Sequence, residues 1–380
     1  MRIFSKTIMR FLKVNNTVLI ANGLNSFDGC PKDIFLEAQK YKRTKNKYYW
    51  VTKDKEMFGK LKKNYENILY AYSLKGFSYI VRSKFYVLNV NTQDFYPGLK
   101  IPNNRTIIQT FHGFPTKSFC KAANEFYSEK EIRKQIEDSF NANNMYIITA
   151  GKYEDEAFHK NCDFPYDRML KIGHPRNDRL KEHERIKAEK KGRIVGDKST
   201  KIVCYCPTWR ENGDFKLFPF EDSNMEEFNN VLKEQNILLI IKLHPLYGKM
   251  NQPIKNYSNI CLYSNEWNID NVELFSIIDL LITDYSSIYC DYLLTNKPVA
   301  FIQYDYEDYI KTRPLSTKRE ILFPGPYINS FTEFKEEMIK LLDDKKYYEK
   351  EREKALKLFY EYYNFDAAKQ TIEFIEKIGD

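Results

Sequence analysis

Short apolar runs of four to seven residues alternate with longer amphipathic stretches along the whole chain. In the first half they lie at 17–21, 48–52, 106–111 and 146–149, with a further helix and strand within 77–90. In the second half they lie at 201–206, 237–243, 260–263, 280–283 and 298–302, and a helical pattern fills the chain from Phe331 onward. Short runs bounded by turn residues predict buried strands. Strands that alternate with helices predict an α/β fold with parallel, doubly wound sheets.

The spacing of these elements also predicts the domain organisation. A chain of 380 residues is too long for one comfortable core, so we expect two domains. Residues 179–200 are strongly charged and poor in apolar side chains, which is typical of a linker or an exposed hinge helix. We therefore predict one Rossmann-like domain over 1–178, a linker over 179–200 and a second Rossmann-like domain over 201–380.

The first thirteen residues form a separate feature. Basic residues recur at helical spacing in 1–13, and apolar residues fill the other side. This pattern predicts a short basic amphipathic helix that is compatible with lying on a membrane. An ordinary surface helix packed on its own domain explains the pattern equally well.

Composition narrows the function classes. The formal charge of +8 is spread along the chain, and no zinc finger, Arg-rich arm or aromatic-basic motif argues for nucleic acid. The positive surplus suits anionic substrates or an anionic membrane surface better. No apolar run approaches the length that spans a bilayer. The seven cysteines are scattered without metal-ligand spacing, so we expect reduced thiols in a cytoplasmic protein.

The most informative stretch is 279–294. Its apolar run ends at Thr283-Asp284-Tyr285-Ser286-Ser287, and a helical pattern follows at once. A strand that turns directly into a helix presents free backbone N–H groups and hydroxyls, which favours an anion site. The competing interpretation is that Asp284 or a serine is only a helix cap.

Four other turns follow apolar runs in the same way. They are His112-Gly113 with Lys117, Pro207-Thr208-Trp209-Arg210, Lys242-Leu243-His244-Pro245, and the basic loop that contains Arg313. Each residue has an ordinary structural explanation, such as a hydrogen-bonding histidine, a salt-bridge arginine or a core tryptophan. However, two of the five histidines, His112 and His244, occupy similar strand-end positions in the two halves. Because α/β proteins bind ligands at this edge, we interpret the turns as one functional set.

In this order, the five motifs resemble the CDP-glycerol glycerophosphotransferases of teichoic acid and capsule synthesis, over about residues 105 to 370. The resemblance implies the GT-B architecture, two Rossmann-like domains facing a cleft, with acceptor choice in the first and the nucleotide donor in the second. It also implies that no metal or other cofactor is needed. It further implies a cytoplasmic enzyme, peripheral on the inner face of the bacterial cell membrane.

The resemblance also implies roles for individual residues. His112 corresponds to the general base, and His244, Ser286, Ser287 and Arg313 to groups that serve the donor pyrophosphate. Thr208 and Arg210 correspond to residues near the nucleotide. The other motif residues expected to bind substrate are Gly113, Lys117, Lys242, Thr283 and Asp284. Two positions depart from the family pattern, since Pro314 follows the loop arginine and Ala367 follows Asp366 where the family usually has glycine. Pro314 bears on the flexibility and donor contacts of the loop, whereas Ala367 replaces one small residue by another.

The predicted function is transfer of glycerol phosphate from CDP-glycerol, or a related CDP-polyol, to a hydroxyl group with release of CMP. The acceptor is expected to be a lipid-linked saccharide or a polyol-phosphate chain. Two alternatives stay open. One is another GT-B transferase that uses CDP-ribitol or a CMP- or UDP-sugar. The other is a non-catalytic GT-B scaffold at the membrane.

Overall fold

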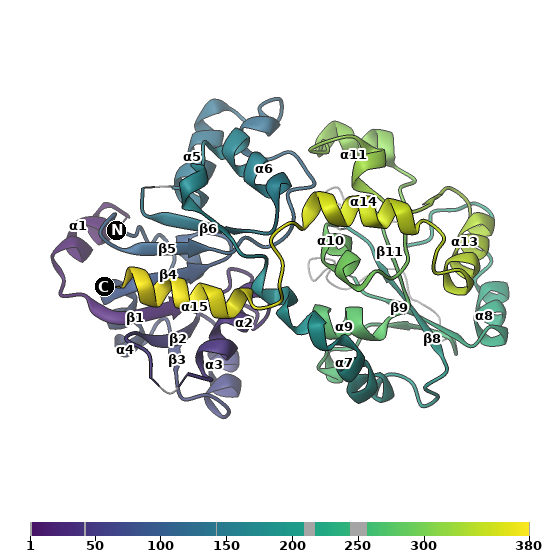
Figure 1. Cartoon of the computed structure of the whole chain (residues 1–380), viewed down its shortest axis with the longest axis horizontal. Helices are drawn as coiled ribbons and strands as arrows, with labels where there is room; N and C mark the ends of the chain where they lie inside the picture. Colours follow the sequence, from purple (N-terminus) through teal and green to yellow (C-terminus); the bar gives the residue numbers. More distant parts are fainter. Residues whose placement is uncertain (1, 42, 142, 209–216, 244–256, 380) are drawn as a thin grey trace. The chain divides into compact units, whose positions relative to one another are not determined.

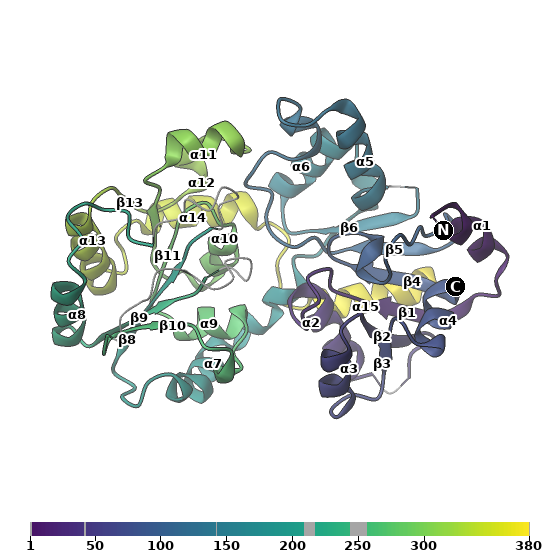
Figure 2. The ribbon, with the colours of Figure 1, turned by 180° about the vertical axis from the view of Figure 1, so that it is seen from behind.

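The computed structural model describes residues 2–41, 43–141, 143–208, 217–243 and 257–379. The chain divides into two compact units. Unit 1 comprises Met1–Pro115, Phe119–Asp178 and Phe359–Asp380, and unit 2 comprises Thr116–Ser118 and Arg179–Leu358. Each unit contains its own parallel sheet, shown from opposite sides in Figures 1 and 2.

The sheet of unit 1 has seven parallel strands in the order β3-β2-β1-β4-β5-β6-β7. Their bounds are β1 Asn15–Ile20, β2 Lys47–Thr52, β3 Ile68–Tyr70, β4 Ser83–Leu88, β5 Thr106–Gln109, β6 Met145–Thr149 and β7 Met169–Lys171. The central strands are buried on both faces, as the continuous apolar runs of the sequence predict.

The helices of unit 1 connect or flank these strands. They are α1 Arg2–Phe11, α2 Gly29–Ala38, α3 Lys55–Lys62, α4 Leu74–Arg82, α5 Glu129–Ser139, α6 Lys152–Cys162 and α15 Ala367–Ile378. Side chains of Asp54, Ser73 and Ser128 accept backbone N–H bonds at the starts of α3, α4 and α5. These caps explain why the helices begin at those residues.

The C-terminal helix α15 belongs to unit 1, which corrects the predicted assignment of 201–380 to one domain. It packs beside α2 (Figure 1) and buries Ile372 and Ile375 in the core cluster that contains Phe35. The Asp178 carboxylate accepts the N–H groups of Ala367 and Ala368 at 3.0 and 2.8 Å. The first turn of α15 is therefore tied to the end of the second segment of unit 1.

The sheet of unit 2 has six parallel strands in the order β10-β9-β8-β11-β12-β13. Their bounds are β8 Lys201–Cys206, β9 Ile237–Ile241, β10 Ile260–Leu262, β11 Leu280–Thr283, β12 Val299–Ile302 and β13 Tyr327–Ile328. The helices are α7 His183–Lys190, α8 Met225–Glu234, α9 Asn271–Ile277, α10 Ile288–Tyr292, α11 Tyr306–Thr312, α12 Arg319–Leu322, α13 Phe331–Asp343 and α14 Glu349–Phe359.

The stretch predicted as a linker is part of unit 2. Helix α7 packs against α9 (Figure 2), and Ile186 on α7 is buried. Arg179 pairs with Asp270 at 2.6 Å and Lys187 with Asp279 at 3.0 Å. The high charge of this stretch therefore serves ion pairs on one domain, not a solvated hinge.

Both sheets share one topology, in which the first strand is central and the fourth lies beside it. This order confirms the predicted doubly wound α/β fold. It places a topological switch point, where ligands bind in such sheets, between β1 and β4 in unit 1 and between β8 and β11 in unit 2. In the part of the chain that the structure describes, no helix is long and apolar enough to cross a membrane. The seven cysteines are free thiols.

Candidate active site

His112 lies just beyond β5 at the carboxyl edge of the unit 1 sheet. Its side chain is exposed, and Nδ1 lies 3.3 Å from the backbone oxygen of Asn89. A carbonyl oxygen can only accept, so this contact assigns the proton to Nδ1. The other ring nitrogen, Nε2, then carries a lone pair that can take a proton from a substrate.

The backbone that delivers His112 is strained. Phe111 has φ of 53°, in the left-handed region that bulky residues rarely adopt. Its ring packs against Phe158 at 5.3 Å and Phe140 at 5.9 Å, and its N–H donates to the buried Gln109 side chain at 3.0 Å. Strain that is held in place by surrounding packing is concentrated at functional sites. Phe111 is therefore the feature that turns the next residue out of the sheet edge.

The surroundings of His112 favour the neutral ring. Desolvation lowers the pKa of His112, the positive charge of Arg176 lowers it further, and the hydrogen bond to Asn89 acts in the opposite direction. Because the side chain is also exposed, water limits how far this pKa falls. A histidine with a pKa below its usual 6.5 is unprotonated at neutral pH, as a general base must be.

A buried ion pair lies close to the same turn. His174 and Glu154 are fully buried, and His174 Nε2 lies 3.1 Å from Glu154 Oε1. The His174 ring meets the Phe114 ring edge-on at 5.2 Å, two residues beyond His112. The pair therefore supports the segment that follows the candidate base.

Unit 2 presents a second polar turn at its own switch point. The Asp284 carboxylate, which follows β11, accepts the Thr208 N–H at 2.8 and 3.0 Å and also the Thr208 hydroxyl. The buried Thr283 hydroxyl donates to the Cys206 carbonyl at 2.6 Å. These hydrogen bonds join the loop after β8 to the loop after β11. They involve Thr208, Thr283 and Asp284, all of which were expected to contact substrate. Their visible role is to hold the loops after β8 and β11 together.

Ser286 and Ser287 follow these hydrogen-bonded loops in the chain and are half-buried. Within the described part of the chain, neither backbone N–H has an acceptor, and the Ser287 hydroxyl has no partner. The following helix α10 has only five residues, so its dipole is weak. The anion-binding capacity predicted here therefore rests on the free N–H groups and hydroxyls of the turn itself.

The segment after His112 joins the basic loop of unit 2. Lys117 bridges Leu315 in antiparallel pairing, and the Ser118 N–H donates to the Pro314 oxygen at 2.8 Å. The acceptor in this pairing is the backbone oxygen of Pro314, which a glycine at the same position would also supply. Arg313 is exposed at the end of α11. Two motifs 196 residues apart, at Lys117 and Arg313, are therefore neighbours along one short ladder.

Fewer contacts are described for the remaining predicted residues. Lys242 follows β9, and its Nζ lies 5.0 Å from the centre of the Tyr263 ring. Gly113 is half-buried beside His112. Arg210 and His244 lie outside the described residues. Across the described ranges, no cluster of three or more His, Cys, Asp or Glu side chains could hold a metal ion.

Several positioning residues were not predicted. The backbone oxygen of Asn89 contacts His112, and its side-chain oxygen accepts the Gly23 N–H at 2.9 Å. The Gln303 side-chain NH2 donates to the backbone oxygen of Asp284 at 2.9 Å, and its side-chain oxygen accepts from Arg319 at 2.7 Å. A polar residue directly after an apolar strand was the available signal, and both Asn89 and Gln303 fit it.

Comparison with known proteins gives a consistent result. A family described as CDP-Glycerol:Poly(glycerophosphate) glycerophosphotransferase matches residues 2–377. The chain is 28% identical to a teichoic acid poly(glycerol phosphate) polymerase of Bacillus spizizenii, over 90% of the chain and 87% of that protein. It is 25% identical to a teichoic acid glycerol-phosphate transferase of Staphylococcus aureus, over 75% and 76% of the two chains.

Among solved structures, the wall teichoic acid polymerase TagF superposes with a TM-score of 0.81 at 23% identity, over 99% of this chain and 93% of that one. The similarity confirms the predicted GT-B fold class.

Proposed function

Because the chain belongs to the CDP-glycerol:poly(glycerophosphate) glycerophosphotransferase family, we propose that it extends or primes a teichoic acid or related polymer with His112 as the general base. An acceptor hydroxyl attacks the phosphorus that carries glycerol in CDP-glycerol. A new P–O bond forms, the pyrophosphate P–O bond breaks, and CMP leaves with the bonding electrons. The product is a phosphodiester.

The orientation of the His112 ring carries this proposal. With Nδ1–H directed to the Asn89 oxygen at 3.3 Å, Nε2 takes the proton of the attacking hydroxyl. The lowered pKa of His112 keeps the ring neutral and ready to accept that proton. General bases of this kind contribute about 10²- to 10⁴-fold in rate.

Unit 2 is proposed to bind the donor. Catalysis of phosphoryl transfer depends on positioning and on neutralising the phosphoryl oxygens. The free N–H groups of Ser286 and Ser287 supply hydrogen bonds, and Lys117, Lys242 and Arg313 supply positive charge. Thr208 and Asp284 keep the turn in place. Arg210 and His244 complete the proposed donor set on the strength of the family motifs.

The acceptor and the location are also proposals. Helix α1 contacts α4, and large apolar side chains stand exposed at Phe11 (85%), Leu74 (94%) and Phe77 (46%). Arg10 and Lys75 are exposed on the same two helices. An apolar surface with basic residues suits an anionic bilayer. Buried Met9 and the bond from Arg105 to the Met9 oxygen at 2.9 Å show that α1 also packs on its own unit. We propose a peripheral enzyme on the inner face of the cell membrane that acts on a lipid-linked saccharide or polyol-phosphate acceptor.

The test is CMP release by purified protein in the presence of a lipid-linked acceptor and EDTA. Donors are CDP-glycerol, CDP-ribitol and a CMP-sugar, and the variants are His112→Ala and His159→Ala. His159 is an exposed histidine on α6, so its variant controls for the loss of any imidazole. We expect release from CDP-glycerol that survives EDTA, falls at least 100-fold in His112→Ala and is retained in His159→Ala.

The outcomes separate the alternatives. Release from CDP-ribitol or a CMP-sugar instead of CDP-glycerol would keep the fold and replace the donor. Full activity of His112→Ala would remove the proposed base. A protein that binds no nucleotide donor by calorimetry would be a scaffold.

A further inference from the structure

Arg319 begins the short helix α12 in unit 2, and the sequence motifs did not single it out. Its guanidinium carbon lies 4.3 Å from the centre of the Tyr306 ring and 4.0 Å from the centre of the Tyr327 ring. Two rings this close cannot share one face of a planar guanidinium, so the tyrosines lie on opposite sides of it. Tyr306 begins α11 and Tyr327 begins β13 (Figure 2). The plane of the guanidinium is therefore held by two separate elements.

The held guanidinium has unused hydrogen-bond donors. Its Nε–H donates to the Gln303 side-chain oxygen at 2.7 Å, and within the described part of the chain neither Nη atom has an acceptor. No acidic side chain of the described residues pairs with Arg319, whereas half-buried Arg179 pairs with Asp270 at 2.6 Å. A half-buried charge is normally compensated, because its partial loss of water costs free energy. Since the Nη atoms are not buried, a ligand can reach their four N–H groups.

One side chain joins this guanidinium to the donor turn. Gln303 follows β12 at the carboxyl edge of the unit 2 sheet and is buried. Its side-chain NH2 donates to the backbone oxygen of Asp284 at 2.9 Å, two residues before Ser286. Arg319, Gln303 and Asp284 therefore lie next to one another along the edge at which Ser286 and Ser287 are proposed to bind the donor.

The proline-rich turn 324–326 explains how Tyr327 reaches this position. A Cβ on Gly325 would lie 2.1 Å from the backbone oxygen of Val299, so a residue with a side chain could not lie this close to β12. The Pro326 oxygen accepts a backbone N–H of β12 at 3.0 Å, and β13 begins at the next residue in parallel pairing with β12. The turn thus places Tyr327 beside the end of β12, where its ring forms one wall of the guanidinium site.

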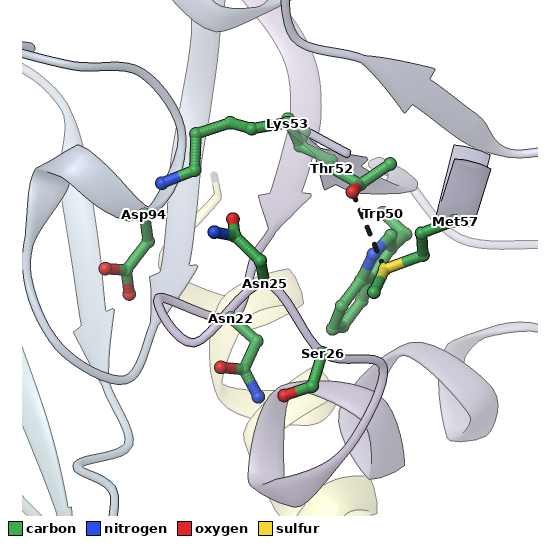
Figure 3. Close-up of a pocket in the computed structure, with 9 residues that line it drawn as sticks. Asn22, Asn25, Ser26, Trp50, Thr52, Lys53, Met57 and Asp94 are labelled. Carbon is green, nitrogen blue, oxygen red and sulfur yellow. Dashed lines mark hydrogen bonds between the residues drawn. The ribbon is translucent and has the colours of Figure 1, made fainter. Parts of the chain in front are cut away.

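The carboxyl edge of unit 1 contains a cation that is arranged differently. Figure 3 shows the Lys53 amine beside Asp94, and the bond described for that amine goes to the Gln93 oxygen at 2.8 Å. The recess that Lys53 and Asp94 line contains no space for a water molecule. Lys53 therefore serves the fold of unit 1, whereas Arg319 presents open donors without a carboxylate beside them.

We propose that Arg319 is a further donor-binding residue, whose two Nη groups bind phosphate oxygens of the donor pyrophosphate. A guanidinium fork binds two phosphate oxygens at once, and a side chain that is already held loses little conformational freedom on binding. Its charge also offsets the Asp284 carboxylate, which would otherwise repel the donor. The inference rests on the proposed function and adds a residue to its donor site.

The test is nucleotide binding, measured by calorimetry in the absence of acceptor. The ligands are cytidine, CDP and CDP-glycerol, and the variants are Arg319→Gln, Arg319→Lys and Arg168→Gln. Arg168 provides the matched control, because it is half-buried and also lies against a tyrosine ring, that of Tyr146 at 4.8 Å, but belongs to unit 1. Its variant therefore loses a stacked arginine that is not part of the proposed donor site.

We expect Arg319→Gln to weaken the binding of CDP and CDP-glycerol about ten- to a hundredfold, as for the loss of hydrogen bonds to a charged group. Cytidine has no phosphate, so its affinity should change less than about twofold, which also shows that the nucleotide site of the variant is folded. Arg319→Lys keeps the charge and loses the fork, so it should recover only part of the CDP affinity. Arg168→Gln should bind all three ligands like the wild type.

Equal losses of cytidine and CDP affinity in a folded Arg319→Gln variant would show a structural role and overturn the inference. Unchanged CDP affinity overturns it as well, even if the wild type releases CMP. If Arg319→Gln does not fold, the ratio of CDP to cytidine affinity in Arg319→Lys decides in the same way. An Arg319-dependent CDP affinity in a protein that releases no CMP from CDP-glycerol would support the residue and reject the proposed reaction. A wild type that binds neither CDP nor CDP-glycerol would overturn both.

Discussion

Replacing Glu154 by Gln tests how much one buried ion pair contributes to unit 1. Burial alone lowers the pKa of His174, but the Glu154 carboxylate 3.1 Å away raises it, and the net pKa is about 9. Glu154 also accepts the Ala150 N–H at 2.7 Å. Glutamine has the same shape and can keep that bond. The substitution removes the charge, and its amide NH2 then faces His174 Nε2, which can accept from it when the ring is neutral.

The magnitude follows from the raised pKa. A change from the usual 6.5 to about 9 corresponds to about 3 kcal/mol, at about 1.36 kcal/mol per pKa unit. Because the folded-state pKa is raised, this stability is fully present below pH 6.5 and is lost as the pH rises through 9. We expect Glu154→Gln to destabilise unit 1 by about 3 kcal/mol at pH 6 and by much less above pH 9. Loss of one partner of a buried pair has effects of this size.

Urea denaturation followed by hydrogen exchange of peptides from β6 and β7 measures unit 1 separately from unit 2. Burial lowers the pKa of Lys297 to about 8, so Lys297 makes unit 2 more stable as the pH rises from 8 towards 10.5. Lys297 is present in both proteins, and its effect cancels in their difference. An equal destabilisation at pH 6 and pH 9.5 would refute the ion-pair reasoning, and so would no effect at pH 6.

Three further changes have defined outcomes. Arg176→Gln removes a positive charge that lowers the pKa of His112, so the acid limb of the kcat/KM profile should move to higher pH. An acid limb that stays at the same pH would show that Arg176 does not affect the pKa of His112. Asp284→Asn weakens the charge-assisted hydrogen bonds between the loops after β8 and β11, and we expect it to cost about 1.5 to 3 kcal/mol in the stability of unit 2, measured by urea denaturation. The double change Lys6→Glu and Arg10→Glu should reduce sedimentation with anionic vesicles at least tenfold, at about 1 kcal/mol per charge, and leave binding to neutral vesicles unchanged.

The sequence predicted the long strands well because parallel strands buried on both faces are continuous apolar runs. The predicted runs 201–206 and 280–283 coincide with β8 and β11. The edge strands β3, β7 and β13, which were not predicted, have only two or three residues, whereas the short edge strand β10 lies within the predicted run 260–263. The charge of 179–200 led to the wrong interpretation, because the ion pairs of Arg179 with Asp270 and of Lys187 with Asp279 depend on partners about ninety residues away.

The candidate site was predicted in part for the same reason. Strand-end residues such as His112 and Lys242 are visible in sequence because an apolar run stops at them. The left-handed Phe111 carries no sequence signal, since its conformation depends on rings that surround it in the fold.

The two switch points are built alike and charged differently. In each unit, a polar side chain after the fourth strand accepts a backbone N–H from the loop after the first, Asn89 from Gly23 at 2.9 Å and Asp284 from Thr208 at 2.8 Å. At the switch point of unit 1 this side chain is the neutral amide of Asn89, which suits hydroxyl groups because they carry no charge. A carboxylate at the second would repel a pyrophosphate, so donor binding there requires cations nearby. The basic residues of unit 2 supply them, Lys242 at the next strand end and Arg313 in the loop paired with Lys117. The charge at each switch point therefore supports the proposed division of the acceptor and the donor between the two units.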